Sequence, residues 1–459
     1  MTSTDTFHQK PTTITLIGAG LVGSLLACYL RKQGYQVEVY ERRSDMRKEG
    51  GYAGRSINLA LSDRGWRGLR GVGLVDEVRK VAIPMAGRMI HNLDGGMAYQ
   101  AYGKEGQAIN SVSRGGLNQL LMDEAEKAGA RIHFNMRCTN LDLESNTLSF
   151  ENTVSGEKST LKSALIISSD GAFSAGRLSM MFSDRSNYSQ YYIEHGYKEL
   201  TIPASDNGGF RLEKNALHIW PRGGYMLIAL PNPDGSFTCT LFFPFEGSPS
   251  FAELDSVEKV RDFFKEIFPD AYAMMPGLEH DFFNNPTGSL VTVKTYPWTF
   301  KNRVLLIGDA AHAIVPFYGQ GMNCGFEDCV ELDRLITEHN HDWNQIMPAY
   351  EKARKPNGDA VADLAMANFI EMRDLVGQPQ FLLRKKIEAR FSERHPGQWT
   401  PLYSMVTFSE TPYSVALREG KRQDRIMDQV MALPDIENKW DSEEVEQLIL
   451  SLLNEKRVV

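Results

Sequence analysis

The sequence has few cysteines, and none are arranged to hold a metal ion or a disulfide framework. Its 459 residues include five cysteines, no two of which stand at C-x-x-C spacing. An odd count without such a pair argues against structural zinc and against a disulfide-stabilised fold. Cys324 and Cys329 could ligate a metal, but we favour small buried residues at both positions. We therefore expect no metal site and a reducing, cytoplasmic location.

Long apolar segments are also missing. Residues 1–10 lack the basic and apolar regions of a signal peptide, and glycines interrupt the first apolar run, residues 14–30. No stretch approaches the roughly 20 apolar residues of a membrane-spanning helix. Residues 443–456 have the apolar spacing of an amphipathic helix. We expect this helix to dock on protein, with contact to a membrane surface as the alternative.

Blocks of basic residues are absent as well. Lys and Arg number 50 against 58 Asp and Glu, which gives a net charge of -8 spread over the chain. This distribution argues against nucleic acid as the main partner. Hydrophobic residues make up 42% and charged residues 24%, as in ordinary globular proteins. The composition leaves the oligomeric state open, with a homodimer as one option.

The pattern that is present begins with strand, turn, helix and strand. Residues 12–17 form a β-branched run, residues 21–32 have helical periodicity, and residues 36–40 alternate as a second strand, which together make one βαβ unit. Short alternating runs between about residues 188 and 293 predict an antiparallel sheet. The chain beyond Trp343 is predicted to be mostly helical. Further helices are expected at residues 62–72, 117–128, 257–267 and 321–338, and further strands at 131–134, 165–168, 216–220, 225–229, 237–243 and 303–307.

The turn after the first strand has the sequence G-x-G-x-x-G, with glycines at Gly18, Gly20 and Gly23. The first permits a tight turn, the second lets the backbone approach a pyrophosphate, and the third lets the helix pack on the strand. Glu41 follows about 20 residues later, where a carboxylate can accept from a ribose hydroxyl. The alternative is a glycine-rich turn in an unrelated α/β protein. The combination predicts a dinucleotide but does not separate FAD from NAD.

A second motif favours FAD. A buried-strand pattern ends in Gly308-Asp309-Ala310-Ala311-His312, and a helix begins at Gly321-Met322-Asn323 after a Pro/Gly loop. Asp309 can bind a ribityl hydroxyl. The helix N-terminus can face the flavin pyrimidine ring, where negative charge gathers on reduction. For His312 we favour a structural role over that of a catalytic base.

A third motif, Asp170-Gly171 with Arg177 six residues later, lies between these two. Alone it is equally well a turn at the end of a strand. In this order the three motifs resemble the group A FAD-dependent aromatic hydroxylases, in which the central segment contacts FAD and the transient NADPH. That family usually has Gly-Ala before the Asp and a bulky residue before the Arg. This chain has Ser168-Ser169 and Gly176 there.

Further segments are similar to one branch of this family, whose substrate is the amino acid L-kynurenine. They are residues 54–61, 87–89, 196–200, 215–221 and 401–408, and the likeness extends from about residue 14 to residue 413. The resemblance implies hydroxylation of L-kynurenine at C3 in tryptophan degradation and pyridine nucleotide biosynthesis. NADPH and O2 would be co-substrates, a flavin C4a-hydroperoxide would be the oxidant, and no obligate catalytic side chain would be needed. The short C-terminal helix resembles the soluble bacterial members.

The resemblance also implies a substrate site. Arg88 and Tyr102 match residues on the substrate carboxylate, and Tyr403 completes that site. A guanidinium fork with two phenol donors suits a carboxylate. The alternatives are a surface ion pair for the arginine and half-buried packing for the tyrosines. The other implied pocket residues are Asn368, near the polar end of the substrate, Met372, and the loop residues Pro316, Phe317 and Gln320, whereas Tyr318 is assigned no role.

The cofactor residues combine the motifs with the resemblance. In chain order they are Gly18, Gly20, Gly23, Glu41, Arg42, Arg55, Leu59, Arg114, Asp170, Asp309, Gly321, Met322 and Asn323. The implied fold is α/β, with a Rossmann-like FAD-binding domain of the glutathione-reductase type. Its expected segments are residues 1–77, 103–187 and 296–375. Residues 78–102 and 188–295 would form an inserted, mainly antiparallel substrate-binding sheet, and residues 376–459 a helical region over the active site.

Two other functions fit part of this pattern. The first is another group A flavin hydroxylase that acts on a phenolic acid. The second is a non-catalytic binding protein on the same fold, as in GDP dissociation inhibitors. The complete glycine fingerprint and the intact Gly308–His312 motif argue against the second alternative.

Overall fold

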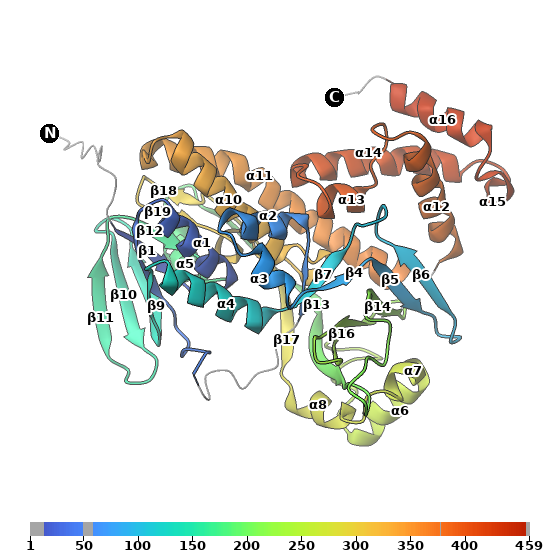
Figure 1. The fold of residues 1–459 in the computed structure, drawn as a ribbon, viewed down its shortest axis with the longest axis horizontal. Helices are drawn as coiled ribbons and strands as arrows, with labels where there is room; N and C mark the ends of the chain where they lie inside the picture. The colour runs from blue at the N-terminus through green and yellow to red at the C-terminus, as the bar shows by residue number, and fades with distance from the viewer. Residues whose placement is uncertain (1–12, 49–57, 377, 456–459) are drawn as a thin grey trace.

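A six-stranded sheet organises the N-terminal part of the molecule in the computed structural model, which describes residues 13–48, 58–376 and 378–455 (Figure 1). Its strands are β1 (Thr13–Ile17), β2 (Gln36–Tyr40), β8 (Arg131–His133), β12 (Ile166–Ser168), β18 (Thr299–Phe300) and β19 (Val304–Leu306). The order is β18-β19-β12-β1-β2-β8, and all neighbours are parallel except β18 and β19. Strands β12 and β19 are buried throughout, as expected for parallel strands covered on both faces.

Helices pack on this sheet and on one another. They are α1 (Leu21–Lys32), α2 (Asp63–Gly71), α3 (Val75–Arg79), α4 (Arg114–Lys127), α5 (Ala175–Met181), α9 (Asp309–His312), α10 (Gly321–Glu338) and α11 (Trp343–Ile370). Helix α1 packs against α4 and α10, and α10 also packs against α2 and α11. Helix α4 begins three residues before its predicted start, because the Ser113 side chain accepts the N–H of Gly116 and caps the helix there.

Two small sheets join these elements, and the sequence did not predict them as sheets. One is antiparallel and contains β9 (Met136–Asp142), β10 (Thr147–Asn152) and β11 (Lys158–Lys162). The other contains β3 (Asn58–Leu61), β4 (Ile83–Met85) and β7 (Ile109–Ser113). Strands β9 and β11 are largely solvent-exposed, so they lack the apolar alternation by which strands are recognised.

A seven-stranded sheet forms the second large layer, with order β17-β13-β16-β15-β14-β5-β6. The strands are β5 (Gly87–His91), β6 (Met97–Ala101), β13 (Asn187–Ile202), β14 (Ala216–Pro221), β15 (Met226–Pro231), β16 (Phe237–Pro244) and β17 (Thr287–Tyr296). Neighbours are antiparallel except β14 and β5. Alternate residues of β15 face opposite sides: Leu227 and Ala229 join the core under α6 (Val257–Ile267), α7 (Pro269–Tyr272) and α8 (Leu278–Asn284), whereas Met226 and Leu230 join the core beside α11.

Helices complete the chain at the upper right of Figure 1. After a π-helical turn, η2 (Glu371–Leu375), follow α12 (Pro379–Arg394), α13 (Leu402–Thr407), α14 (Tyr413–Met431), α15 (Ile436–Lys439) and α16 (Glu443–Asn454). Val445 and Ile449 of α16 are buried against Ile426 and Met427 of α14, which confirms that this amphipathic helix docks on protein. None of the helices in the described ranges is long and apolar enough to cross a membrane.

Candidate active site

One cavity of about 630 Å³ extends from the glycine loop after β1 to Tyr403 on α13. Of the predicted cofactor residues, it is lined by Gly18, Gly20, Glu41, Arg42, Leu59, Arg114, Asp170, Asp309, Gly321 and Met322. Of the predicted substrate residues, it is lined by Arg88, Tyr102, Pro316, Phe317, Met372 and Tyr403. The fold thus brings together residues from both large sheets and from the C-terminal helices. Arg55 lies outside the described residues.

The glycine loop has a geometry that only glycine allows. Gly18 has a φ of +96°, and a Cβ there would lie 2.7 Å from the carbonyl oxygen of Ser169. A Cβ at Gly23, which lies behind the loop, would be 2.0 Å from the carbonyl oxygen of Gly18, so the glycine lets α1 approach β1. A Cβ at Gly20 would meet nothing within 4 Å. The N–H groups at the start of α1 are therefore open to an anion in the cavity.

Glu41 lies at the end of β2 beside this loop. One carboxylate oxygen accepts the N–H of Ala19 at 2.9 Å, and the other accepts from the backbone N–H and the Nε of Arg43, each at 2.9 Å. Burial raises the pKa of Glu41, but the Arg43 guanidinium and these hydrogen bonds outweigh it and hold the pKa below its ordinary value. Glu41 is therefore an ionised, oriented acceptor at the edge of the cavity.

Asp170 accepts a hydrogen bond from the first residue of α5 and still offers one oxygen. Its Oδ2 accepts the N–H of Ala175 at 2.7 Å, whereas the buried Oδ1 has no hydrogen-bond partner among the described residues. The unusual residues of this motif compensate one another. A Cβ at Gly176 would lie 1.9 Å from Ser168 Oγ, so the small residue before Arg177 makes room for the serine. Ser169 Oγ donates to the carbonyl oxygens of Ile17 and Gly18.

Asp309 reaches the cavity from the end of the buried strand β19. Its side chain is exposed to the cavity but enclosed by protein. That enclosure raises the pKa of Asp309, although His312 and Arg114 act in the opposite direction. Gly321 and Met322, the first residues of α10, line the same cavity. The positive end of the α10 dipole therefore points at the space beside Asp309.

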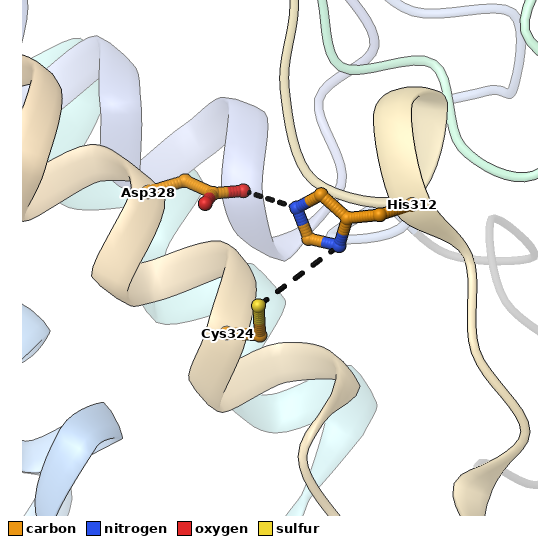
Figure 2. Close-up of side chains that lie close together, drawn as sticks. All are labelled: His312, Cys324 and Asp328. Carbon is orange, nitrogen blue, oxygen red and sulfur yellow. Dashed lines mark hydrogen bonds and ion pairs between the residues drawn. The ribbon is translucent and has the colours of Figure 1, made fainter. Parts of the chain in front are cut away.

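His312, three residues after Asp309, belongs to a buried ion-pair network, and Figure 2 shows its contact with Asp328. His312 Nε2 lies 2.6 Å from Asp328 Oδ2, and the second oxygen of Asp328 accepts from Arg354 Nε at 2.6 Å. Burial lowers the pKa of His312, but Asp328 outweighs it and raises this pKa well above its ordinary value. His312 is absent from the cavity lining. Its contacts are those of a structural cation that holds the motif turn, because Asp328 also accepts the N–H of Gly308.

The same geometry disfavours a metal ion. The ligand atoms of His312, Cys324 and Asp328 lie within 4.8 Å of one another (Figure 2). The guanidinium of Arg354, however, occupies one side of this group, and its Nη2 lies 3.4 Å from Cys324 Sγ. A guanidinium repels a second cation and uses the lone pairs that a metal would need. The group is a hydrogen-bonded network rather than a set of metal ligands.

The other end of the cavity contains Arg88 and a group of tyrosines. Arg88, on β5, is 4% exposed, and its Nε has no hydrogen-bond partner among the described residues. Its guanidinium carbon lies 5.3 Å and 5.2 Å from the ring centres of Tyr102 and Tyr403, which stack on each other at 4.9 Å. Tyr318, to which the sequence assigned no role, lines the cavity and stacks on Tyr403 at 5.5 Å.

Three predicted side chains do not line the cavity. Gln320 accepts from the Tyr413 hydroxyl at 2.9 Å, and Asn368 donates to the carbonyl oxygen of Phe317 at 2.7 Å. Asn323 accepts from the N–H of Ser62 and donates to two backbone carbonyls. Each amide is therefore used to hold the loop before α10 or its neighbours. The structure places these residues behind the lining, since their hydrogen bonds to backbone groups and to the Tyr413 hydroxyl hold the side chains away from it.

The sequence missed two kinds of residue, one in the cavity lining and one just outside it. Apolar residues of the seven-stranded sheet, including Leu217, Met226 and Phe242, line the cavity, but in the sequence they look like ordinary core positions. Glu371, in the π-helical turn η2, places its Oε1 3.8 Å from Arg88 Nη1. A π-helical turn after a long helix is a frequent mark of a functional site, but only the backbone of the folded chain reveals it.

Comparison with known proteins identifies the family. The chain matches the family model of the FAD binding domain over residues 11–207 and 287–365. It is 51% identical over 445 residues to a kynurenine 3-monooxygenase of Flavobacterium johnsoniae, which covers 97% of this chain and 99% of the relative. A kynurenine 3-monooxygenase of Flavobacterium psychrophilum is 50% identical over 448 residues, covering 98% and 100%. The chain belongs to the kynurenine 3-monooxygenase family.

Members of the kynurenine 3-monooxygenase family are FAD-dependent enzymes, and the predicted fold class is confirmed. A solved structure, the tetrameric form of 2-methyl-3-hydroxypyridine-5-carboxylic acid oxygenase, superposes with a TM-score of 0.66 at 20% identity and covers 81% of this chain and 95% of its own. The cavity fits FAD. It offers an open glycine loop at Gly20, an unpartnered carboxylate oxygen on Asp170 and the N-terminus of α10.

The strand that carries Arg88 in this kynurenine 3-monooxygenase fold is anchored by a buried histidine pair. His91, at the end of β5, has its Nε2 2.9 Å from Nδ1 of His218 and its Nδ1 2.8 Å from Asp270. Nε2 of His218 lies 2.8 Å from the carbonyl oxygen of Glu213. Because a carbonyl only accepts, His218 donates from Nε2 and, when neutral, accepts at Nδ1. Burial lowers the pKa of His218 to about 4.

We expect replacement of His218 by glutamine to make the fold less sensitive to mild acid. The pKa of His218 falls from 6.5 to about 4 on folding, so the unfolded chain binds the extra proton and stability is lost as the pH falls through this window. The loss from this group between pH 7 and 4.5 is on the order of 2–3 kcal/mol. Glutamine keeps a donor and an acceptor but does not titrate. The midpoint of thermal unfolding should fall less in the variant over this range, and an equal fall would contradict the assignment.

Proposed function

We propose that this chain hydroxylates L-kynurenine at ring carbon 3, next to the aniline carbon, with bound FAD and with NADPH and O2 as co-substrates. Membership of the kynurenine 3-monooxygenase family supports the reaction. The observation that carries the substrate assignment is Arg88, a buried guanidinium whose Nε lacks a hydrogen-bond partner within the described chain. An unpaired buried donor of this kind is costly unless a ligand pairs with it. A substrate carboxylate would supply that pairing.

The tyrosines would assist Arg88 as neutral donors. Burial raises the pKa of Tyr403 to about 12, even though Arg88 acts in the opposite direction. Burial also raises the pKa of Tyr102 well above its ordinary value. Both phenols therefore keep their protons near neutral pH and can donate to a carboxylate without adding charge. Arg88, Tyr102 and Tyr403 would fix one end of the substrate and thereby orient its ring.

The rest of the cavity would orient the ring and exclude water. When bound, FAD supplies the redox chemistry, because it accepts hydride from NADPH and activates O2. Phe317 stacks on Phe369 at 4.0 Å and packs against Phe242 at 4.8 Å, which makes an apolar wall beside the loop. Asn368 would act on this wall by holding the Phe317 carbonyl. The N-terminus of α10 would stabilise negative charge on the flavin ring.

We extend the proposal to the domain organisation, the cellular compartment and the oligomeric state of the protein. We propose the domain division given above, with the site between its parts, and Gly18, Gly20, Gly23, Glu41, Asp170 and Asp309 as the main FAD contacts. The cysteine content, without a C-x-x-C pair, supports a reducing compartment such as the cytoplasm. A homodimer stays a proposal to be measured by light scattering.

The test is product analysis with purified protein. With L-kynurenine, NADPH and air, we expect a yellow FAD-containing protein that forms 3-hydroxykynurenine and oxidises NADPH faster when kynurenine is present. The control omits kynurenine. Turnover of a hydroxybenzoate without any 3-hydroxykynurenine would replace this proposal by a phenolic-acid hydroxylase. A colourless protein that cannot be reconstituted with FAD would point to a non-catalytic binding protein.

A further inference from the structure

Glu371 is the carboxylate that the structure places against Arg88. Its Oε1 lies 3.8 Å from Arg88 Nη1, and its Oε2 lies 3.9 Å from Lys385 Nζ. Both distances exceed a hydrogen bond, and within the described residues neither oxygen accepts a shorter one. The side chain is 28% exposed. Glu371 therefore combines a fixed position beside the arginine with oxygens that can still accept strong hydrogen bonds.

The π-helical turn η2 puts Glu371 directly before a residue of the cavity lining, although Glu371 itself is not part of that lining. Met372, the next residue, lines the cavity, and its Sδ lies 3.2 Å from Nδ2 of Asn368 one turn earlier. Tyr318 also lines the cavity. Burial raises the pKa of its phenol above the ordinary value, and Glu371 is close enough to raise it further. Glu371 thus lies beside Arg88 and near Tyr318, just outside the residues that line the cavity.

An α-amino acid brings two charges to the space beside Arg88. Its ammonium and carboxylate are attached to the same carbon, so a carboxylate on Arg88 forces the ammonium to lie within a few ångströms. A buried ammonium is costly without an anionic partner. Tyr102 and Tyr403 cannot supply the charge, since burial keeps both phenols protonated. Among the described residues, Glu371 is the carboxylate in reach of Arg88.

We propose that Glu371 binds the α-ammonium of the substrate, so that Arg88 and Glu371 together recognise a zwitterion. This inference rests on the proposed function, because it presumes that Arg88 binds the carboxylate. It makes Glu371 the residue that selects an amino acid over an aromatic monocarboxylate of the same shape. The preference arises from charge, since a monocarboxylate on Arg88 would leave the carboxylate of Glu371 facing a second anion, with only the distant Lys385 as a cationic partner among the described residues.

The test compares two ligands on the holoenzyme. One is L-kynurenine, and the other is its deamino analogue, which keeps the 2-aminobenzoyl ring and the carboxylate but lacks the α-ammonium. Dissociation constants are measured from the perturbation of the FAD absorption spectrum, without NADPH. Glu371→Gln should weaken kynurenine binding about tenfold or more, the worth of a charge-assisted hydrogen bond. It should leave binding of the analogue unchanged or make it tighter.

A control variant and the outcomes that would contradict the proposal complete the test. Lys385→Met is the matched control, because Lys385 contacts the second oxygen of Glu371; it should keep the preference for kynurenine. Tighter binding of both ligands to Glu371→Gln would overturn the proposal and make Glu371 a competitor for Arg88. Equal weakening of the binding of both ligands by Glu371→Gln, or no change in either dissociation constant, would also overturn the proposal. If Glu371→Gln does not fold, Glu371→Asp decides, since a shorter acid should weaken kynurenine alone. Wild-type protein that neither binds nor hydroxylates kynurenine would instead remove the proposed function.

Discussion

Replacing Arg88 by methionine is expected to raise the KM for L-kynurenine about 100-fold or more, because a buried charge partner of the substrate is lost. The FAD absorption spectrum should stay unchanged. Arg88 is 4% exposed, and Tyr102 and Tyr403 flank its guanidinium at 5.3 Å and 5.2 Å. Methionine keeps most of the apolar packing of the side chain. Steady-state NADPH oxidation at varied kynurenine, with FAD content measured by absorbance, checks both parts.

Two further variants test whether the effect is specific to the guanidinium of Arg88. Arg88→Lys keeps the charge but loses the fork, so its KM should lie between those of the wild type and Arg88→Met. Arg211→Met is the control, because Arg211 is a partly exposed arginine whose acidic partner, Asp206, lies 3.7 Å away in solvent; its KM should not change. Loss of FAD from Arg88→Met would move Arg88 to the cofactor site. An unchanged KM would mean that the carboxylate binds elsewhere.

Replacing Arg354 by methionine is expected to cost the fold about 3–5 kcal/mol, because two buried carboxylates lose their partner. Arg354 donates to Glu327 at 2.8 Å and to Asp328 at 2.6 Å, and its side chain is 5% exposed. Glu327 also pairs with buried Arg64 of α2 at 2.6 Å, and Arg64 Nε donates to the carbonyl oxygen of Val406 on α13 at 2.8 Å. The change therefore also reaches the contact between α2 and the C-terminal helices. Thermal unfolding of the holoenzyme, followed by circular dichroism and flavin fluorescence, measures the loss.

The chain offers a matched control on α10, the helix that carries Glu327 and Asp328. Arg334 also pairs with two carboxylates, those of Glu331 and Glu338, but its side chain is 51% exposed. An exposed ion pair contributes roughly 0–1 kcal/mol, so Arg334→Met should unfold at nearly the wild-type temperature. Equal effects of the two variants would show that burial does not set the strength of the Arg354 network.

Much of the local structure could be predicted from the sequence. Helices α1, α6 and α10 and strand β2 have the predicted bounds, because their ends are marked by residues with a clear physical role. Gly20 starts α1, Gly34 with a φ of +82° follows its end, and the Ser256 side chain caps α6. Such signals act between neighbours in the chain and need no knowledge of the fold.

The cavity could be predicted only in part. Motif residues such as Gly20 and Asp309 line it as expected, since strand-end and helix-start positions follow from the βαβ pattern. The amides of Gln320 and Asn368 do not line it, because nearby backbone and hydroxyl groups satisfy them. Whether a polar side chain contacts a ligand or a neighbouring carbonyl depends on long-range packing, and the periodicity of the sequence does not predict that packing.

The sequence by itself determined the family, the FAD fingerprint and the order of the main elements, because these depend on spacing along the chain. Only the tertiary structure decided which charged side chains lie close together. Arg88 comes from a sheet strand, Glu371 from a π-helical turn and Tyr403 from a C-terminal helix, and hundreds of intervening residues must fold before they meet. That packing sets how far each side chain is buried, and therefore how strongly their charges interact.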